Sequence, residues 1–217
     1  MKGLLIKDWK LLKNQGRFFL MILTISLIPL FFTQSYVSFI TSYLTFIFSV
    51  FVLSTLSYDS YDNGMVFLLS LPISRKIYVQ EKYLFSLLLA SGSWLLSLIL
   101  RLTVFSLRTS LTEGLKAILM DPIYLILALF FLEYSLPLHL KFGNEKGRML
   151  SFFTLGLFAF GVFTIVRTTQ GLRILSSLEH IGTQSPSSVI VISVLLCALF
   201  FGISYHLSVR ILEKKEF

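Results

Sequence analysis

The chain has 217 residues, of which 55% are hydrophobic and only 14% are charged, whereas soluble domains carry about 25% charged residues. Its mean hydropathy is +0.82, and the apolar residues come in long runs that a water-soluble core does not require. The composition therefore excludes an ordinary soluble domain and predicts an all-α, polytopic membrane protein, with one membrane domain over residues 1–217.

The net charge of +8 raises the question of an acidic partner. Its basic residues flank the apolar runs and do not form a patch together with side chains that would read bases. This arrangement argues against nucleic acid and favours the inner surface of a lipid bilayer.

Residues 1–17 have the pattern of an amphipathic helix that lies in the membrane interface. Leu5, Trp9 and Leu12 fall on one helical face, with Trp9 at the level of the lipid headgroups. The opposite face is polar and carries Lys7, Lys10, Asn14 and Arg17. A disordered basic tail is the alternative.

Six membrane spans follow this segment. About 17–25 apolar residues are needed to cross the hydrocarbon core as a helix. The runs that meet this requirement are approximately residues 18–35, 37–57, 83–105, 122–140, 150–166 and 188–208.

The distribution of lysine and arginine predicts the orientation of these spans. Only four such residues fall on one side, and Arg101 lies within a span. The other side holds fourteen: Lys2, Lys7, Lys10, Lys13, Arg17, Arg75, Lys76, Lys82, Lys141, Lys146, Arg148, Arg210, Lys214 and Lys215. Because basic residues concentrate in cytoplasmic segments, both termini and the loop at 58–82 are predicted to be cytoplasmic.

The stretch Ser57–Tyr83 predicts two short helices with a break between them. Ser60 is placed to cap the first helix, Pro72 disfavours helix at the residue before it, and Ser74 is placed to cap the second. One face of the first helix is apolar at helical spacing and consists of Met65, Leu68 and Leu69. We expect this face to be exposed for a partner; an ordinary solvated loop is the alternative.

This stretch and the N-terminus resemble the permease subunits of ATP-binding-cassette transporters of the type-2 exporter class, in particular the small bacterial members. The motifs that carry the resemblance are Met1-Lys2-Gly3-Leu4-Leu5-Ile6-Lys7-Asp8-Trp9-Lys10, Asp62-x-Gly64, Ser70-Leu71-Pro72-Ile73-Ser74-Arg75-Lys76, Tyr78 and Lys82-Tyr83. Many members have glutamates where this chain has Asp59 and Asp62.

The resemblance implies that the loop holds a coupling helix that touches separate ATPase subunits, which would bind ATP and Mg²⁺. It also implies a second permease copy or a homologous permease, in the cytoplasmic membrane of a bacterium. The coupling residues predicted on this basis are Asp59, Asp62, Gly64, Met65, Leu68, Leu69, Pro72, Arg75 and Lys76.

Two ionisable residues, Glu133 and Arg101, lie inside the predicted spans. A charge at the bilayer midplane is unfavourable by at least a few kcal/mol, so Glu133 should face protein or water or be protonated. Arg101 lies about one turn from the outer end of its span and is expected to extend outward to the interface. Two roles are open for Glu133: it acts in gating or substrate contact, or it forms hydrogen bonds within the bundle. The lone Cys197 is expected to pack as a small apolar residue.

Enzyme signatures do not occur in the sequence. It contains no Gly-x-x-x-x-Gly-Lys-Ser/Thr phosphate loop and no His-Glu-x-x-His motif, and the three histidines lack the spacing of metal ligands. Neither a catalytic residue, a metal site nor a cofactor is therefore predicted in this chain.

These observations predict a permease subunit of an ATP-driven exporter, with an amphipathic or antimicrobial peptide or a hydrophobic drug as its substrate. A membrane immunity or scaffold protein that binds a partner without transport is the main alternative. An ion-coupled carrier is disfavoured because Glu133 is almost alone among midplane ionisable groups.

Overall fold

The computed structural model describes residues 1–28, 37–61, 64–108, 122–166 and 186–215. Within these residues all regular secondary structure is helical and there is no strand. The helices are α1 (Lys2–Asn14), α2 (Gly16–Leu27), α3 (Val37–Ser60), α4 (Gly64–Ser70), α5 (Arg75–Arg108), α7 (Pro122–Phe142), α8 (Asn144–Val166) and α10 (Pro186–Lys214). The predicted all-α fold is thus confirmed.

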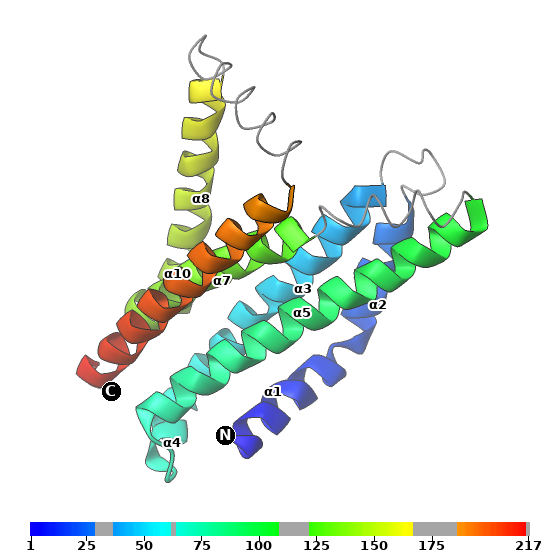
Figure 1. The fold of residues 1–217 in the computed structure, drawn as a ribbon. Helices are drawn as coiled ribbons and strands as arrows, with labels where there is room; N and C mark the ends of the chain where they lie inside the picture. The colour runs from blue at the N-terminus through cyan, green and yellow to red at the C-terminus, as the bar shows by residue number, and fades with distance from the viewer. Residues whose placement is uncertain (29–36, 62–63, 109–121, 167–185, 216–217) are drawn as a thin grey trace.

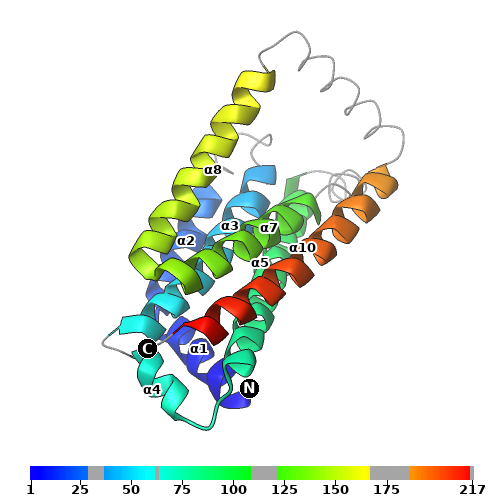
Figure 2. The same ribbon diagram turned by 90° about the vertical axis from the view of Figure 1, so that its left-hand side faces the viewer.

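Four long helices, α3, α5, α7 and α10, form the centre of the bundle (Figure 1). The α1 and α2 helices lie along the side formed by α5 and α3, while α8 contacts α7 at its start and diverges from the bundle toward its end (Figure 2). The apolar core follows the facing sides of these helices, with Val52 of α3, Val79 of α5, Leu132 of α7 and Leu212 of α10 fully buried.

Four of the helices are long and apolar enough to cross a membrane: Phe39–Ser60, Arg75–Thr103, Pro122–Phe142 and Ile190–Lys214. They correspond to the second, third, fourth and sixth predicted spans. The first predicted span begins with α2, a shorter apolar helix, and residues 29–35 lie outside the described residues. The fifth corresponds to α8, which is not among the four, so the count of six stays a prediction.

The spans contain many serines and threonines, and several of their hydroxyls donate to backbone carbonyls of their own helix. Ser49 donates to the carbonyl of Thr45 (2.6 Å), and Thr55 donates to that of Val52 (2.8 Å). In lipid there is no water to satisfy polar groups. This back-bonding to residues three or four positions earlier lets hydroxyl side chains reside in apolar helices.

The segments predicted to be cytoplasmic gather at one end of the bundle, which we call the basic end. It holds the N-terminus, α4 and the C-terminus (Figure 1). The turn between α7 and α8 lies there too, because the Asn144 amide lies 3.3 Å from the carbonyl of Ser57. Lys215 also donates to the carbonyl of Leu140 at 2.9 Å. The charge count predicts that this end faces the cytoplasm.

The loop between α3 and α5 contains the predicted break. The α4 helix ends at Ser70, just before Leu71-Pro72, and α5 begins at Arg75. Its cap is Ser74, whose Oγ accepts from the amide of Ile77 at 3.3 Å. Ser60 is not a cap, which corrects the prediction: α3 continues through it, and its hydroxyl donates to the carbonyl of Leu56.

Two glycines make the tight turn between α7 and α8 possible. Gly143 has φ of 81°, a conformation that favours glycine because it lacks a Cβ. A Cβ on residue 147 would lie 2.7 Å from the Cα of His139. The start of α8 therefore packs directly on the backbone of α7.

Candidate functional site

A cluster of buried charges joins three helices at the basic end. The Lys82 ammonium of α5 lies 2.5 Å from Asp8 Oδ2 of α1 and 2.7 Å from Asp59 Oδ2 of α3. Lys7 of α1 also donates to Asp59. The Lys82 and Asp8 side chains are 1% and 0% exposed. We call these residues, together with Glu81, the charge cluster.

Neutral groups complete the cluster. The Tyr78 hydroxyl donates to Asp59 Oδ2 at 2.9 Å, and Lys82 donates to Thr55 Oγ1 at 3.1 Å. The Glu81 carboxylate lies 3.8 Å from the Lys82 ammonium, and neither of its oxygens accepts a hydrogen bond from the described residues. The cluster therefore holds three carboxylates against two ammonium groups.

The cluster fixes α1 to the transmembrane bundle. Burying a charge is strongly unfavourable unless an opposite charge accompanies it, so these partners hold one another in place. The sequence analysis did not identify Asp8 as a site residue. The available signal was its position one helical turn after Leu4, which places both residues on the same face of α1, the face that is buried. Asp59 was expected at a surface facing the ATPase, whereas the structure buries its carboxylate here.

The apolar residues of α4 divide into two faces. Met65 is buried, and Leu68 and Leu69 pack half-buried against the core. The expectation that these three form the exposed face is therefore wrong. The exposed apolar residues lie on the other face and its flanks, where they form what we call the outer α4 patch: Tyr61, Val66, Phe67 and Leu71.

The remaining coupling candidates lie around α4. A Cβ on Gly64 would lie 2.8 Å from the carbonyl oxygen of Asp59, so this glycine permits the close approach of α4 to the end of α3. Pro72 is exposed in the break that follows α4. Asp62 lies outside the described residues.

Arg75 and Lys76 connect the start of α5 to the end of α10. The Arg75 guanidinium donates to the carbonyls of Leu212 (2.8 Å) and Glu213 (2.7 Å). These are carbonyls of the last helical turn, which lack partners within the helix. The exposed Lys76 ammonium lies 3.6 Å from the Glu213 carboxylate. The loop is thus tied to α10 as well as to α3.

The two intramembrane candidates lie apart from this end. Glu133 is 2% exposed, and its described side-chain partner is the Cys197 thiol, which donates to Oε1 at 3.5 Å. Its backbone carbonyl accepts from Ser204, whose hydroxyl also lies 2.5 Å from that of Tyr83. Cys197 is buried, but its thiol has a polar contact in addition to apolar packing.

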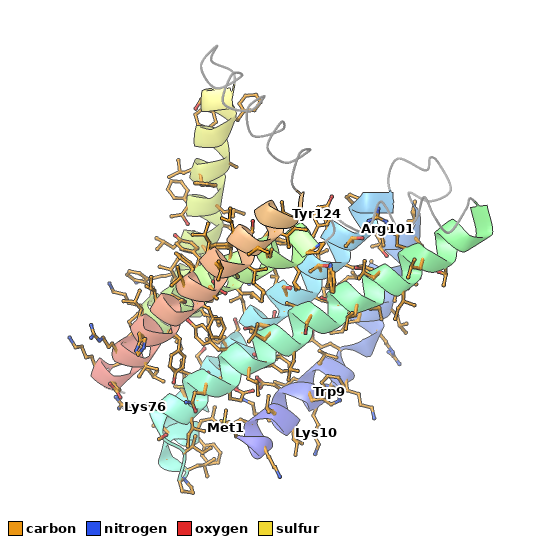
Figure 3. All side chains as sticks on the ribbon, in the orientation of Figure 1. Met1, Trp9, Lys10, Lys76, Arg101 and Tyr124 are labelled. Atoms are coloured by element: carbon orange, nitrogen blue, oxygen red, sulfur yellow. The ribbon has the colours of Figure 1, made fainter. Side chains whose placement is uncertain are left out.

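Arg101 does not extend outward as expected. Arg101 is only 2% exposed. It lies at the opposite end of the bundle from the charge cluster (Figure 3). The charged group is thus enclosed by the protein, which avoids contact with lipid without extension to the interface.

The apolar helices, the buried polar contacts and the charged end define an α-helical integral membrane protein. The sequence profile described as ABC-2 family transporter protein matches residues 3–213. The chain therefore belongs to this family and is a membrane component of an ABC transporter, not itself the ATPase. Searches of curated proteins and of solved structures found no match.

Proposed function

We propose that this chain is the permease subunit of an ATP-driven exporter in the bacterial cytoplasmic membrane. Two permease subunits, identical or homologous, would form the translocation pathway. Separate cassette ATPase subunits that bind ATP and Mg²⁺ would drive them through the loop at 57–83. Family membership supports the permease role, and the outer α4 patch is the observation that carries the proposed coupling.

The outer α4 patch presents apolar side chains at an end that the charge pattern predicts to be in water. Tyr61 is 74% exposed, Phe67 is 67% exposed and Val66 is 46% exposed. An exposed group of large apolar side chains favours coverage by a partner. A short helix that offers one apolar face suits insertion into a groove on that partner.

The contacts behind this patch give a route for transmitting motion. Gly64 brings α4 against the end of α3, and Arg75 ties the following helix to the end of α10. Because packed helices shift as rigid elements between discrete arrangements, a displacement of α4 by the ATPase would be passed to α3, α5 and α10 together.

The substrate proposed is an amphipathic or antimicrobial peptide or a hydrophobic drug. A cavity of about 340 Å³ beside Glu133 supports this class, because its walls between α7 and α10 include Pro137, Phe200 and Ile203. The cavity suits an apolar group of the substrate, and its polar lining residues, Glu133, Tyr134, Lys141 and Ser204, could orient that group.

Substitution of Val66 and Phe67 together by Ser tests the coupling surface. Both side chains point away from the core, so the variant should reach the membrane in normal amounts. Recovery of a cassette ATPase, identified by mass spectrometry in the wild-type preparation, should fall about tenfold, since buried aromatic anchors dominate such interfaces. Met149→Ser is the matched control, because Met149 is 73% exposed on α8.

Unchanged ATPase recovery in the double variant would remove the coupling role from the outer α4 patch. The non-transporting immunity or scaffold protein remains the second candidate, since it would use the same patch to hold a partner. Transport in proteoliposomes distinguishes this candidate from an exporter. An exporter moves a hydrophobic fluorescent peptide in an ATP-dependent manner, whereas a scaffold does not.

A further inference from the structure

A groove runs between α1 and α5 on the side of the bundle remote from α8. Its volume is about 480 Å³. Phe85 and Leu89 are buried at its base, and Leu88 of α5 lines it while remaining 57% exposed. From α1 it receives Trp9 and the two lysines Lys10 and Lys13. The groove thus combines an apolar wall with two amines at one edge.

The charge cluster fixes which face of α1 lines this groove. Asp8 and Leu4 point into the protein and are 0% and 4% exposed, whereas Trp9 is 62% exposed and Ile6 is 56% exposed. Figure 3 shows Trp9 and Lys10 on the side of α1 turned away from α7, α8 and α10. Rotating α1 to bury Trp9 would break the ion pairs of Asp8, so this apolar surface must be covered from outside.

The groove continues a surface that faces hydrocarbon. Along α5, the exposed apolar side chains recur on one helical face at Leu84, Leu88, Leu95 and Ile99. These residues belong to the membrane-spanning part of α5. An occupant that extends from the groove along this face therefore meets lipid tails, which favours a lipid over a soluble protein partner.

The two lysines supply the charge that the occupant must match. Lys10 and Lys13 are three residues apart on α1, and no ion pair or hydrogen bond joins either side chain to a described residue. Lysine ammonium groups bind phosphate as point charges. Tryptophan favours the headgroup level of a bilayer, so Trp9 marks the depth at which that phosphate would lie.

We propose that this groove binds one anionic phospholipid of the adjacent leaflet. Lys10 and Lys13 hold its phosphate, Trp9 packs at the glycerol level, and an acyl chain lies against Phe85 and Leu88. The lipid covers the outer face of α1 while the charge cluster holds its inner face, so binding stabilises the docked position of this helix. The inference does not depend on the proposed coupling to an ATPase.

Quenching of Trp9 fluorescence by brominated lipids tests the site in the full-length protein. In a Trp94→Phe background Trp9 is the only tryptophan. Phosphatidylcholine nanodiscs would contain one tenth brominated phosphatidylglycerol or, in parallel, one tenth brominated phosphatidylcholine. We expect several-fold stronger quenching by phosphatidylglycerol, because anionic lipid is enriched near the two lysines.

Matched variants separate a site from general charge attraction. In K10Q/K13Q this several-fold preference should be lost, so that the two brominated lipids quench Trp9 about equally. It should persist in K10R/K13R and in K146Q/K214Q, which removes two exposed lysines elsewhere at the basic end. Size-exclusion elution as for the wild-type protein establishes that each variant is folded.

Three outcomes would overturn the proposal. Equal quenching by the two brominated lipids would mean ordinary annular contact. Equal loss of the preference in K146Q/K214Q would mean a diffuse electrostatic effect. Relief of quenching by millimolar inorganic phosphate would mean that the lysines hold a soluble anion and that the groove does not select a lipid.

Discussion

The two sides of the bundle are built in different ways. On the side of α1 and α3, the membrane span of α3 is 56% buried within the protein, and ion pairs lock its end to α1 and α5. On the side of α8 and α10, the span of α10 is only 11% buried. There, the exposed residues are large and apolar, including Phe158 of α8 and Leu199 of α10. The first side is anchored by its own contacts, while the second leaves its surface to lipid or to another subunit.

This difference predicts where substitutions are harmful. On the anchored side, a change that leaves a buried charge without a partner should destabilise the isolated chain. On the open side, a similar loss of side-chain volume should matter little to the isolated chain and should act only through whatever covers the surface.

The largest effect is expected at the charge cluster. Lys82→Met would leave Asp8 and Asp59 buried without their shared ammonium partner, which should destabilise the protein by about 3–5 kcal/mol. Thermal unfolding in detergent measures this loss. Lys76→Met is the control, because Lys76 pairs with Glu213 at the surface and its loss should have little effect. An unfolding temperature of Lys82→Met equal to that of the control would show that the cluster does not anchor α1.

An intermediate effect is expected at the contact between α3 and α4. Gly64→Ala places a Cβ 2.8 Å from the carbonyl oxygen of Asp59, so α4 must shift. Overpacking of this kind destabilises by about 1–3 kcal/mol. Gly92→Ala is the matched control, since a Cβ there has no neighbour within 4 Å and alanine favours helix by up to about 1 kcal/mol. If both variants unfold alike, the close approach of α4 is not required.

The smallest effect is expected on the open side. Leu199 is 67% exposed, so Leu199→Ala should change the stability of the isolated chain by less than about 0.5 kcal/mol. The fully buried Leu132 gives the contrast, because Leu132→Ala should destabilise by about 2–5 kcal/mol. Both variants are measured by thermal unfolding. A loss of stability in Leu199→Ala comparable to that in Leu132→Ala would show that the α10 surface is packed against protein, which would contradict the comparison of the two sides.

Local signals predicted the helical fold well. The break at Pro72 and the cap at Ser74 follow from backbone restrictions that act over a few residues. Four of the predicted spans coincide with helices of spanning length, because apolar length alone indicates such helices. In contrast, the prediction that Ser60 caps α4 was wrong. A serine can either cap a helix or donate to the backbone of the helix before it, and its role here depends on where α3 ends.

The candidate site was harder to predict because its contacts are distant in sequence. Asp8 and Lys82 are 74 residues apart, and nothing local to either residue indicates the other. The α4 helix is apolar on both faces from Met65 to Leu69, so periodicity could not identify the side that faces the core. The burial of Arg101 likewise depends on neighbouring helices, whereas its position near a span end indicated only a short route to the interface.

The pairing of Asp8 with Lys82 also sets the order of events during biogenesis. Domains are synthesised from the N-terminus at about 5–20 residues per second, so α1 leaves the ribosome about 4–15 s before its partner on α5. During that interval Asp8 lacks Lys82, whereas Lys7, whose ammonium lies 3.2 Å away in the final structure, is made beside it. The α1 helix can therefore take its docked position only after α3 and α5 have been made.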